Sequence, residues 1–164
     1  MDKKLSTTLS ENATLVRVVL GHPSGIKSDK SLKNDLAEDL EGYPNVKCYQ
    51  LDVTSTENIE EAKSRILKDF TTIDVIINNA GLGYRSFVEL SEDSKINNIV
   101  NVNWLGVVKV CRAFIPIFRE QNYGQFINIT SIAGLVNLPL GNFYHSTKQA
   151  VESFSECMSY ELLD

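Results

Sequence analysis

The chain alternates short apolar runs with longer stretches in which apolar residues recur at helical spacing. The clearest run is Ile73-Asp74-Val75-Ile76-Ile77, which is short and almost continuously apolar, as expected of a strand buried on both faces. Three more runs predict strands at 15–20, 46–51 and 126–129. Repeated β-α alternation requires parallel strands with right-handed crossovers. We therefore expect an α/β fold, a doubly wound parallel sheet with helices on both faces.

Four helices are expected between and after these strands. Leucines at every fourth position predict the first helix over 32–40, before Gly42-Tyr43-Pro44. A second helix should begin at Ser55 or Thr56, where the following acidic residues favour a helix N-terminus. A third, with a broad apolar face, should cover roughly 92–120. The last carries Tyr144 and an apolar stripe C-terminal to it.

The composition indicates a soluble globular protein. Its 164 residues are enough for one domain, which we place at 14–164, after a polar and disordered tail at 1–13. The formal charge of −5 argues against nucleic acid or an anionic membrane as the main partner. No secretory signal is visible and no apolar run approaches the length of a membrane span, so we expect a cytoplasmic protein.

The three cysteines give no sign of a disulfide framework or a metal site. Cys48, Cys111 and Cys157 are widely spaced and include no C-x-x-C pair. We expect reduced thiols in or near the core and no bound metal.

Small or polar residues follow three of the predicted strands directly. They are Asp52, Asn78-Asn79-Ala80-Gly81 and Ser131. Any one of them could be an ordinary strand-to-helix turn, since such turns prefer these residue types. In an open parallel sheet, however, ligands bind outside the carboxyl ends of the strands. Three strands that deliver such residues to one edge indicate a ligand site there.

Tyr144 and Lys148 are four residues apart on the last predicted helix. At that spacing, both side chains project from one helix face about one turn apart. An ammonium near a phenol favours the phenolate, which makes the tyrosine a usable general acid/base near neutral pH. The pair alone is weak evidence, because two solvated residues on an ordinary helix would show the same spacing. His145 should point elsewhere on the helix and have a structural role.

Taken together, these motifs resemble the short-chain dehydrogenase/reductase family over residues 74–163. Ser131 lies thirteen residues before Tyr144, which is the usual spacing in that family. The matching pieces are Leu51-Asp52-Val53, Asn78-Asn79-Ala80-Gly81, Asn101-Val102-Asn103-Trp104-Leu105-Gly106, Asn128-Ile129-Thr130-Ser131-Ile132-Ala133-Gly134 and Tyr144-x-x-x-Lys148. The fold that the resemblance implies is a Rossmann-like, three-layer α/β/α domain.

The resemblance implies a role for each of four catalytic residues. Tyr144 would give a proton to a carbonyl during reduction, or remove one during alcohol oxidation. Ser131 would hydrogen-bond the substrate oxygen. Lys148 would support Tyr144 and hold the nicotinamide ribose, and Asn103 would anchor a water in a proton relay.

The resemblance also implies a nicotinamide cofactor, NAD or NADP, which would supply the hydride. Its binding residues would be Asp52, Val53, Asn79, Ala80, Gly81, Tyr144 and Lys148. The substrate would be a small carbonyl or alcohol, with lipid-like carbonyls among the candidates, and the protein would be a homo-oligomer.

The N-terminal part departs from the family pattern, which opens with a strand and a T-G-x-x-x-G-x-G turn for the pyrophosphate. In one alignment, residues 20–27 are a degenerate form of this turn, with Lys27 where the last glycine belongs. In the other, which the distance from Gly21 to Asp52 favours, residues 15–20 are the second strand and the first β-α unit is absent. In that alignment His22 lies where an acid would select NAD, which favours NADP.

Two hypotheses of different classes follow. Relative to the family, we expect the domain to be incomplete at both ends, because its pattern also stops within the helix that carries Tyr144. The first hypothesis is an oxidoreductase that interconverts a secondary alcohol and a ketone or aldehyde. The second is a catalytically inactive, truncated relative that acts as an interaction module.

Overall fold

The structure is a computed structural model that describes residues 47–162. The predictions for the tail 1–13, the strand 15–20, the segment 20–27 with His22, and the helix 32–40 lie outside the described residues.

Two of the predicted strands form a parallel pair. β1 (Val75–Asn78) runs beside β2 (Gln125–Asn128), with Val75 opposite Gln125 and Asn78 opposite Asn128. β1 starts two residues later than predicted and β2 one residue earlier. The predicted parallel arrangement is confirmed for this pair.

The strand predicted at 46–51 was wrong as a continuous strand. Leu51 forms an isolated bridge and residues 47–50 carry no strand. A strand requires a partner along its length, and no described residue pairs with 47–50. Burial nevertheless alternates as it would in a strand, because Tyr49 and Leu51 are buried while Gln50 is exposed.

The predicted helices of the described region are present. They are α2 (Thr56–Asp69), α3 (Asp93–Val100), α4 (Gly106–Gln121) and α5 (Asn142–Glu161), with short 3-10 turns η1 (Val88–Leu90) and η3 (Ile132–Gly134). Ser55 caps α2 by accepting a hydrogen bond from the Asn58 N–H at 3.1 Å, as its residue type predicts. Asn122 ends α4 in the left-handed conformation, with φ of 54°.

The helix predicted over 92–120 contains a feature that its periodicity did not predict. α3 and α4 are joined without a break by η2 (Asn101–Leu105), one turn of π-helix. Such turns insert an extra residue into a helix and are frequent at functional sites.

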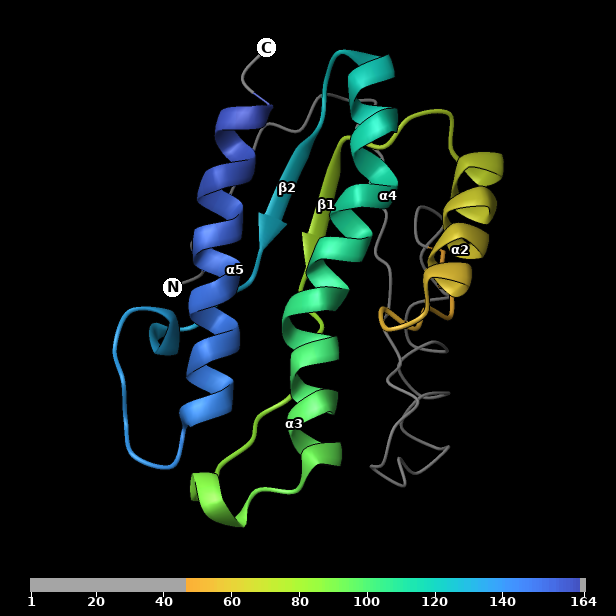
Figure 1. The fold of residues 1–164 in the computed structure, drawn as a ribbon. Helices are drawn as coiled ribbons and strands as arrows, with labels where there is room; N and C mark the ends of the chain where they lie inside the picture. Colours follow the sequence, from red (N-terminus) through yellow and green to blue (C-terminus); the bar gives the residue numbers. More distant parts are fainter. Residues whose placement is uncertain (1–46, 163–164) are drawn as a thin grey trace, which may run out of the picture.

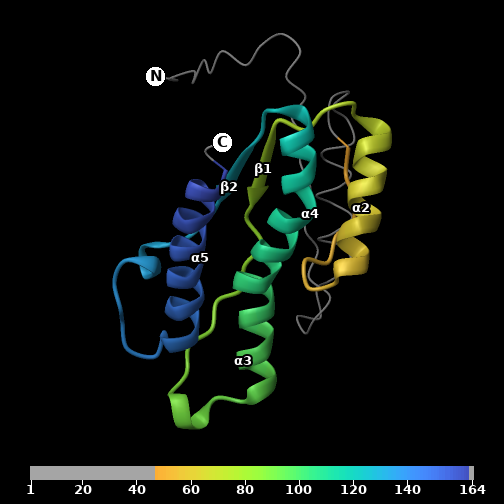
Figure 2. The ribbon, with the colours of Figure 1, turned by 45° about the horizontal axis from the view of Figure 1, so that its top comes forward.

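Helices α2, α4 and α5 lie side by side on one face of the sheet (Figures 1 and 2). The main core lies among α2, α4 and the strands, and includes Leu51, Ile66 and Phe114. On the opposite face, Ile77 and Ile127 remain exposed. Among the described residues, the second helix layer of the predicted three-layer fold is therefore not seen.

By length and composition alone, the segment Asp93–Gln121 could cross a membrane. Its position in the fold is that of a core helix. The α4 part buries Val110, Cys111 and Phe114 against the sheet, α2 and α5.

The cysteines are free, as predicted, but Cys157 is exposed and its predicted place in or near the core was wrong. α5 turns Val151 and Met158 towards α4, and a residue adjacent to Met158 points about 100° away from that face. Cys111 is buried, and burial raises the pKa of its thiol to about 12.

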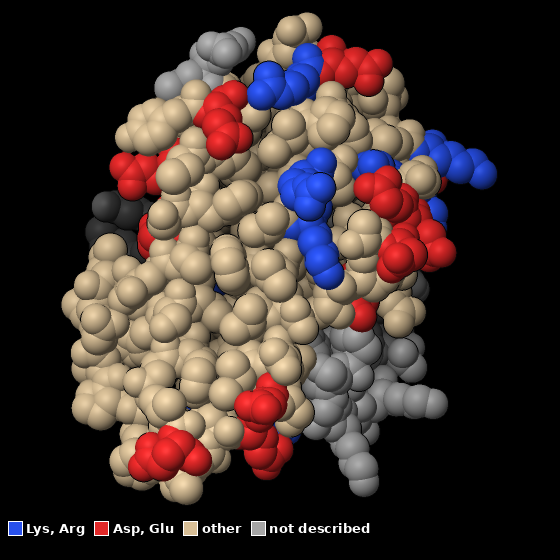
Figure 3. Space-filling model, in the orientation of Figure 1, with Lys and Arg blue, Asp and Glu red and all other residues tan. Residues whose placement is uncertain are grey.

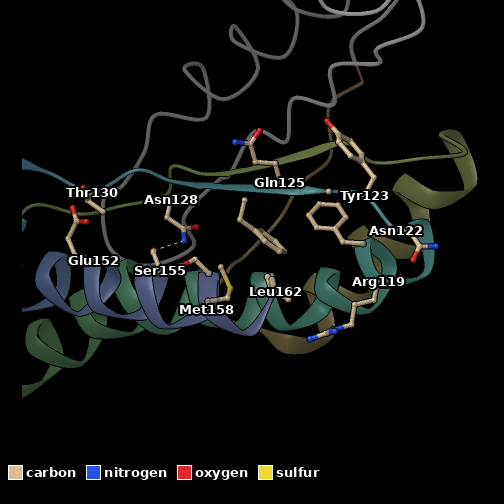
Figure 4. A pocket seen from close by; sticks show the side chains of 14 residues that line it. Arg119, Asn122, Tyr123, Gln125, Asn128, Thr130, Glu152, Ser155, Met158 and Leu162 are labelled. Atoms are coloured by element: carbon tan, nitrogen blue, oxygen red, sulfur yellow. Dashed lines mark hydrogen bonds between the residues drawn. The ribbon is translucent and has the colours of Figure 1, made fainter. Parts of the chain in front are cut away.

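A groove of about 830 Å³ runs between β2 and α5 (Figure 4). Gln125 and Ile129 donate their N–H groups towards the β1 side, to the carbonyls of Asp74 and Asn78. Because alternate residues of a parallel strand face opposite edges, Phe126 and Asn128 present their backbone to the groove. Among the described residues, this edge of β2 has no neighbouring strand.

Candidate active site

The segments that follow β1 and β2 leave the sheet at the same edge (Figure 1). Because the strands are parallel and Asn78 lies opposite Asn128, the segments 79–81 and 129–131 begin next to each other. The prediction that strand ends bring small and polar residues to one edge is confirmed for these two strands. Asn79 and Gly81 are exposed there, whereas Ala80 is half-buried against the core.

Lys148 is brought to this edge by α5. It is only 6% exposed, and its Nζ donates to the Ile129 carbonyl at 2.9 Å, just beyond the end of β2. The same Nζ lies 5.9 Å from the centre of the Tyr144 ring. An ammonium has three N–H donors and is costly to bury unpaired. With Ile129 as its one acceptor among the described residues, Lys148 retains donors for a ligand.

Ser131 and Tyr144 line one cleft of about 510 Å³. Ser131 begins η3, and its Oγ accepts a hydrogen bond from the Ala133 N–H at 3.2 Å. That bond uses a lone pair of Oγ and leaves the hydroxyl hydrogen free to donate. The cleft therefore offers two hydroxyl donors, on Ser131 and Tyr144, to an oxygen bound between its walls.

Asn103 lies in the π-helical turn η2 and is 1% exposed. Its Oδ1 accepts from the Leu82 N–H at 2.7 Å, and its Nδ2 donates to the Leu82 carbonyl at 2.9 Å. Nδ2 also donates to Thr147 Oγ1 at 3.2 Å. The Asn103 side chain thus ties the segment after β1 to α5. The implied role in a water relay stays a prediction, since these bonds concern positioning.

Gly81 lies against Asn103 and Lys148. A Cβ placed on Gly81 would be 3.6 Å from both Asn103 Oδ1 and Lys148 Nζ, which is ordinary contact distance. A side chain at this position would therefore occupy the space in front of the buried ammonium, and glycine keeps it open.

Asp52 is used in a local turn at the start of α2. Its Oδ1 accepts from the Thr54 N–H at 2.9 Å and from Thr54 Oγ1 at 2.7 Å, and its own N–H donates to Asn58 Oδ1. No contact among the described residues joins Asp52 to Tyr144 or Lys148. Its assignment to the adenine part of a cofactor stays a prediction.

Val53 is buried, and its side chain packs on Gly106 at the start of α4. A Cβ on Gly106 would lie 2.8 Å from Val53 Cγ2, so the close approach requires glycine there. The side chain of Val53 belongs to the core, together with Val102. Contact with a cofactor would therefore use the Val53 backbone.

His145 is buried and its contacts are structural, but it also lines the cleft with Tyr144, so the prediction that it points elsewhere was wrong. Its Nδ1 lies 2.6 Å from the Val136 carbonyl, to which it must donate because a carbonyl only accepts. A Cβ on Gly141 would lie 2.3 Å from the imidazole ring. Together these contacts hold the loop of residues 135–141 against α5.

The sequence did not predict the role of two groups of polar residues. Thr147 is buried and accepts from Asn103 while its hydroxyl donates to the Tyr144 carbonyl. Asn128 donates to Ser155 Oγ at 2.8 Å (Figure 4). Asn78 donates to Asn128 Oδ1 at 2.8 Å, so the two bonds link both strands to α5. The one available signal was an asparagine at the end of each apolar strand.

The comparisons with known proteins decide the family. Residues 11–164 match the pattern of the short chain dehydrogenase family. The chain belongs to this family, whose members are NAD(P)-dependent oxidoreductases with a Rossmann fold. The predicted family and fold class are confirmed.

The relatives differ in substrate and in cofactor. The chain is 35% identical over 122 residues to a 3-ketodihydrosphingosine reductase of Bacteroides thetaiotaomicron, covering 74% of this chain and 45% of the relative. It is 34% identical over 138 residues to an NADP-dependent 3-hydroxy acid dehydrogenase of Schizosaccharomyces pombe, covering 82% and 53%. A solved short chain dehydrogenase/reductase of Burkholderia phymatum in complex with NAD superimposes with a TM-score of 0.76 at 27% identity, over 81% of this chain and 48% of that one.

The chain spans about half the length of the curated relatives that it matches.

The described residues fit the nicotinamide-ribose half of a nicotinamide dinucleotide. The free donors of Lys148 and the open space at Gly81 suit the hydroxyls of a ribose. The segment predicted to contact the pyrophosphate lies outside the described residues.

Proposed function

We propose that the chain is part of an NAD(P)(H)-dependent oxidoreductase that interconverts a secondary alcohol and a ketone or aldehyde. The observation that carries the proposal is the convergence of three groups. Ser131 and Tyr144 line one cleft, and the buried ammonium of Lys148 lies 5.9 Å from the centre of the Tyr144 ring.

In reduction, the substrate carbonyl oxygen accepts hydrogen bonds from Ser131 and Tyr144. A bound nicotinamide cofactor supplies the hydride. As the oxygen gains negative charge, the Tyr144 hydroxyl gives it a proton, and the resulting phenolate is stabilised by the nearby ammonium of Lys148. In oxidation, the Tyr144 phenolate removes the proton from the alcohol.

Lys148 has a second role in this proposal. The donors that Ile129 does not use would bind the ribose hydroxyls of the cofactor. Asn103 positions the segment after β1 and the helix that carries Tyr144 and Lys148, because it bonds Leu82 on one side and Thr147 of α5 on the other. We propose NADP over NAD from the position of His22 in the sequence, and we propose a cytoplasmic homo-oligomer.

The test follows NADPH absorbance with a panel of ketones, using the 164-residue chain and the Tyr144→Phe variant. We expect turnover by the chain and a loss of about 10²-fold to 10⁴-fold in the variant. Equal and near-zero rates for both would defeat the proposal.

An inactive interaction module is the second candidate. The edge of β2 that has no partner within residues 47–162 favours it, since an open strand edge is a template for pairing with another chain. A titration of NADPH by fluorescence separates the two candidates. Saturable binding at micromolar concentration supports the enzyme, whereas absence of binding together with absence of turnover supports the module.

A further inference from the structure

The cleft beside Tyr144 has one wall with a permanent charge. Among the residues that line it, Arg85 is the one whose side chain is always ionised. The remaining lining includes Ile132, Val136 and Leu138 from the loop after β2. A permanently charged residue and an apolar wall that line the same cleft are an unusual combination for a site that would bind only a simple ketone.

The backbone on both sides of Arg85 is held in place. Tyr84 packs on Phe143 of α5, with ring centres 6.2 Å apart. Ser86 donates its N–H to the Leu140 carbonyl at 2.9 Å. The position from which the Arg85 side chain leaves the backbone is therefore fixed relative to the opposite wall of the cleft.

Arg85 makes no ion pair within the described residues. Glu89 is only four residues further along the chain and is exposed, yet it does not pair with the guanidinium. The five N–H donors of the guanidinium form a planar fork that matches the two oxygens of a carboxylate or phosphate.

The apolar wall is open to solvent. Ile132 is 74% exposed, Leu138 59% and Val136 44%. Figure 3 shows a broad uncharged area where Figure 1 places this loop and the N-terminal half of α5. Exposed apolar side chains grouped around a cleft are expected where a ligand covers them.

We propose that the cleft selects carbonyl compounds, and the corresponding alcohols, that carry both an apolar chain and an oxyanion. Arg85 binds the oxyanion, the loop 131–141 covers the chain, and Ser131 and Tyr144 face the carbonyl. Only the contact of Ser131 and Tyr144 with the carbonyl rests on the proposed oxidoreductase function. Arg85 is thus a specificity residue, and an ammonium in place of the oxyanion would be repelled.

The first test measures binding and needs no turnover. Octanoate, octyl phosphate, methyl octanoate and octylammonium are compared by ligand-observed NMR on the 164-residue chain. We expect the better of the two anions to bind about fivefold to tenfold tighter than the ester, and octylammonium to bind weakest. The better anion identifies the oxyanion as carboxylate or phosphate.

The variants assign the preference to one residue. Arg85→Gln should bring the anions and the ester to equal affinity, while Arg112→Gln, on exposed α4 surface and outside the cleft, should keep the difference. Circular dichroism checks that both variants are folded. Equal binding of anion and ester by the unaltered chain overturns the inference, and so does a preference that survives in Arg85→Gln.

The second test compares turnover of 4-oxodecanoate and its methyl ester. We expect a kcat/KM about fivefold to tenfold higher for the acid, lost in Arg85→Gln. If the anion preference is present in binding but neither compound is reduced, the oxidoreductase proposal fails while the oxyanion site stands. If both are reduced equally well and Arg85→Gln changes nothing, the oxyanion site fails while the oxidoreductase stands.

Discussion

The cleft beside Tyr144 is lined by side chains that can donate protons and bind charge, whereas the groove between β2 and α5 borders a strand edge that no described strand pairs with. The cleft is held by contacts between neighbouring segments, such as Asn103 with Leu82 and Ser86 with Leu140. The groove has the Asn128–Ser155 bond across it, and the β2 backbone groups that border it have no strand partner among the described residues. The cleft lined by Ser131 and Tyr144 is therefore formed although, within residues 47–162, the sheet beside it has a free edge.

The largest expected effect concerns the cleft. Lys148→Met removes the ammonium behind Tyr144, and we expect ketone reduction to fall by about 10²-fold to 10⁴-fold. NADPH turnover measures this. Lys109→Met is the matched control, since Lys109 also donates to a backbone carbonyl, that of Thr54, but lies outside the cleft. Equal rates for the two variants would contradict the role given to Lys148.

The next effect concerns the support of the cleft. Asn103→Ala leaves both the N–H and the carbonyl of Leu82 without their partner, so we expect a loss of about 2–4 kcal/mol in the free energy of unfolding. Urea denaturation measures this. Asn97→Ala, at an exposed position of α3, should stay within about 0.5 kcal/mol of the unaltered chain. An equal effect of both substitutions would show that the Leu82 contacts contribute nothing.

The third prediction concerns the groove side. Asn128→Leu removes the acceptor of the buried Asn78 amide and the donor to Ser155, at an expected cost of about 1–3 kcal/mol in unfolding free energy. The double variant Asn78→Leu/Asn128→Leu should be less destabilised than the sum of the two single variants, because no buried amide is then left unpaired. Additive losses in a double-mutant cycle would contradict the pairing.

The smallest effect concerns two thiols, the exposed Cys157 on α5 and the buried Cys111 on α4. At about pH 8, Cys157 should react with an alkylating reagent in the native state, and Cys111 only after unfolding, because thiolate is the reactive form. Mass spectrometry of the labelled chain measures this. Modification of Cys111 at the same rate as Cys157 would contradict its burial.

Cys111 also predicts a dependence of stability on pH. Burial raises the pKa of its thiol from 9.0 to about 12 in the folded state. A raised pKa means that the contribution to stability is fully present below about pH 9 and is lost as the pH rises towards about 12. Urea denaturation at about pH 8 and about pH 10.5 should show this loss, and Cys111→Ala should show less of it.

Much of the fold could be predicted from residue patterns. The apolar run at 73–77 and the helical periodicities of 56–69 and 92–121 depend on residues close in sequence, so they were recognisable without a structure. The π-helical turn at Asn101–Leu105 was not, because the apolar periodicity of the segment fits an uninterrupted α-helix. The exposed Cys157 was also missed, because an apolar stripe does not show which of its members faces the neighbouring helix.

The candidate site, like the fold, could be predicted from the sequence only in part. The sequence alone determined which residue types stand after the strands and on α5, since Ser131, Tyr144 and Lys148 match a family spacing. Only the tertiary structure decided that Lys148 is buried against Ile129, that Val53 faces the core, and that Arg85 lines the cleft with Tyr144. The reason is physical. Spacing along a helix or strand fixes the direction of a side chain, but burial and partners depend on segments that are distant in sequence and meet only when the sheet and its helices pack.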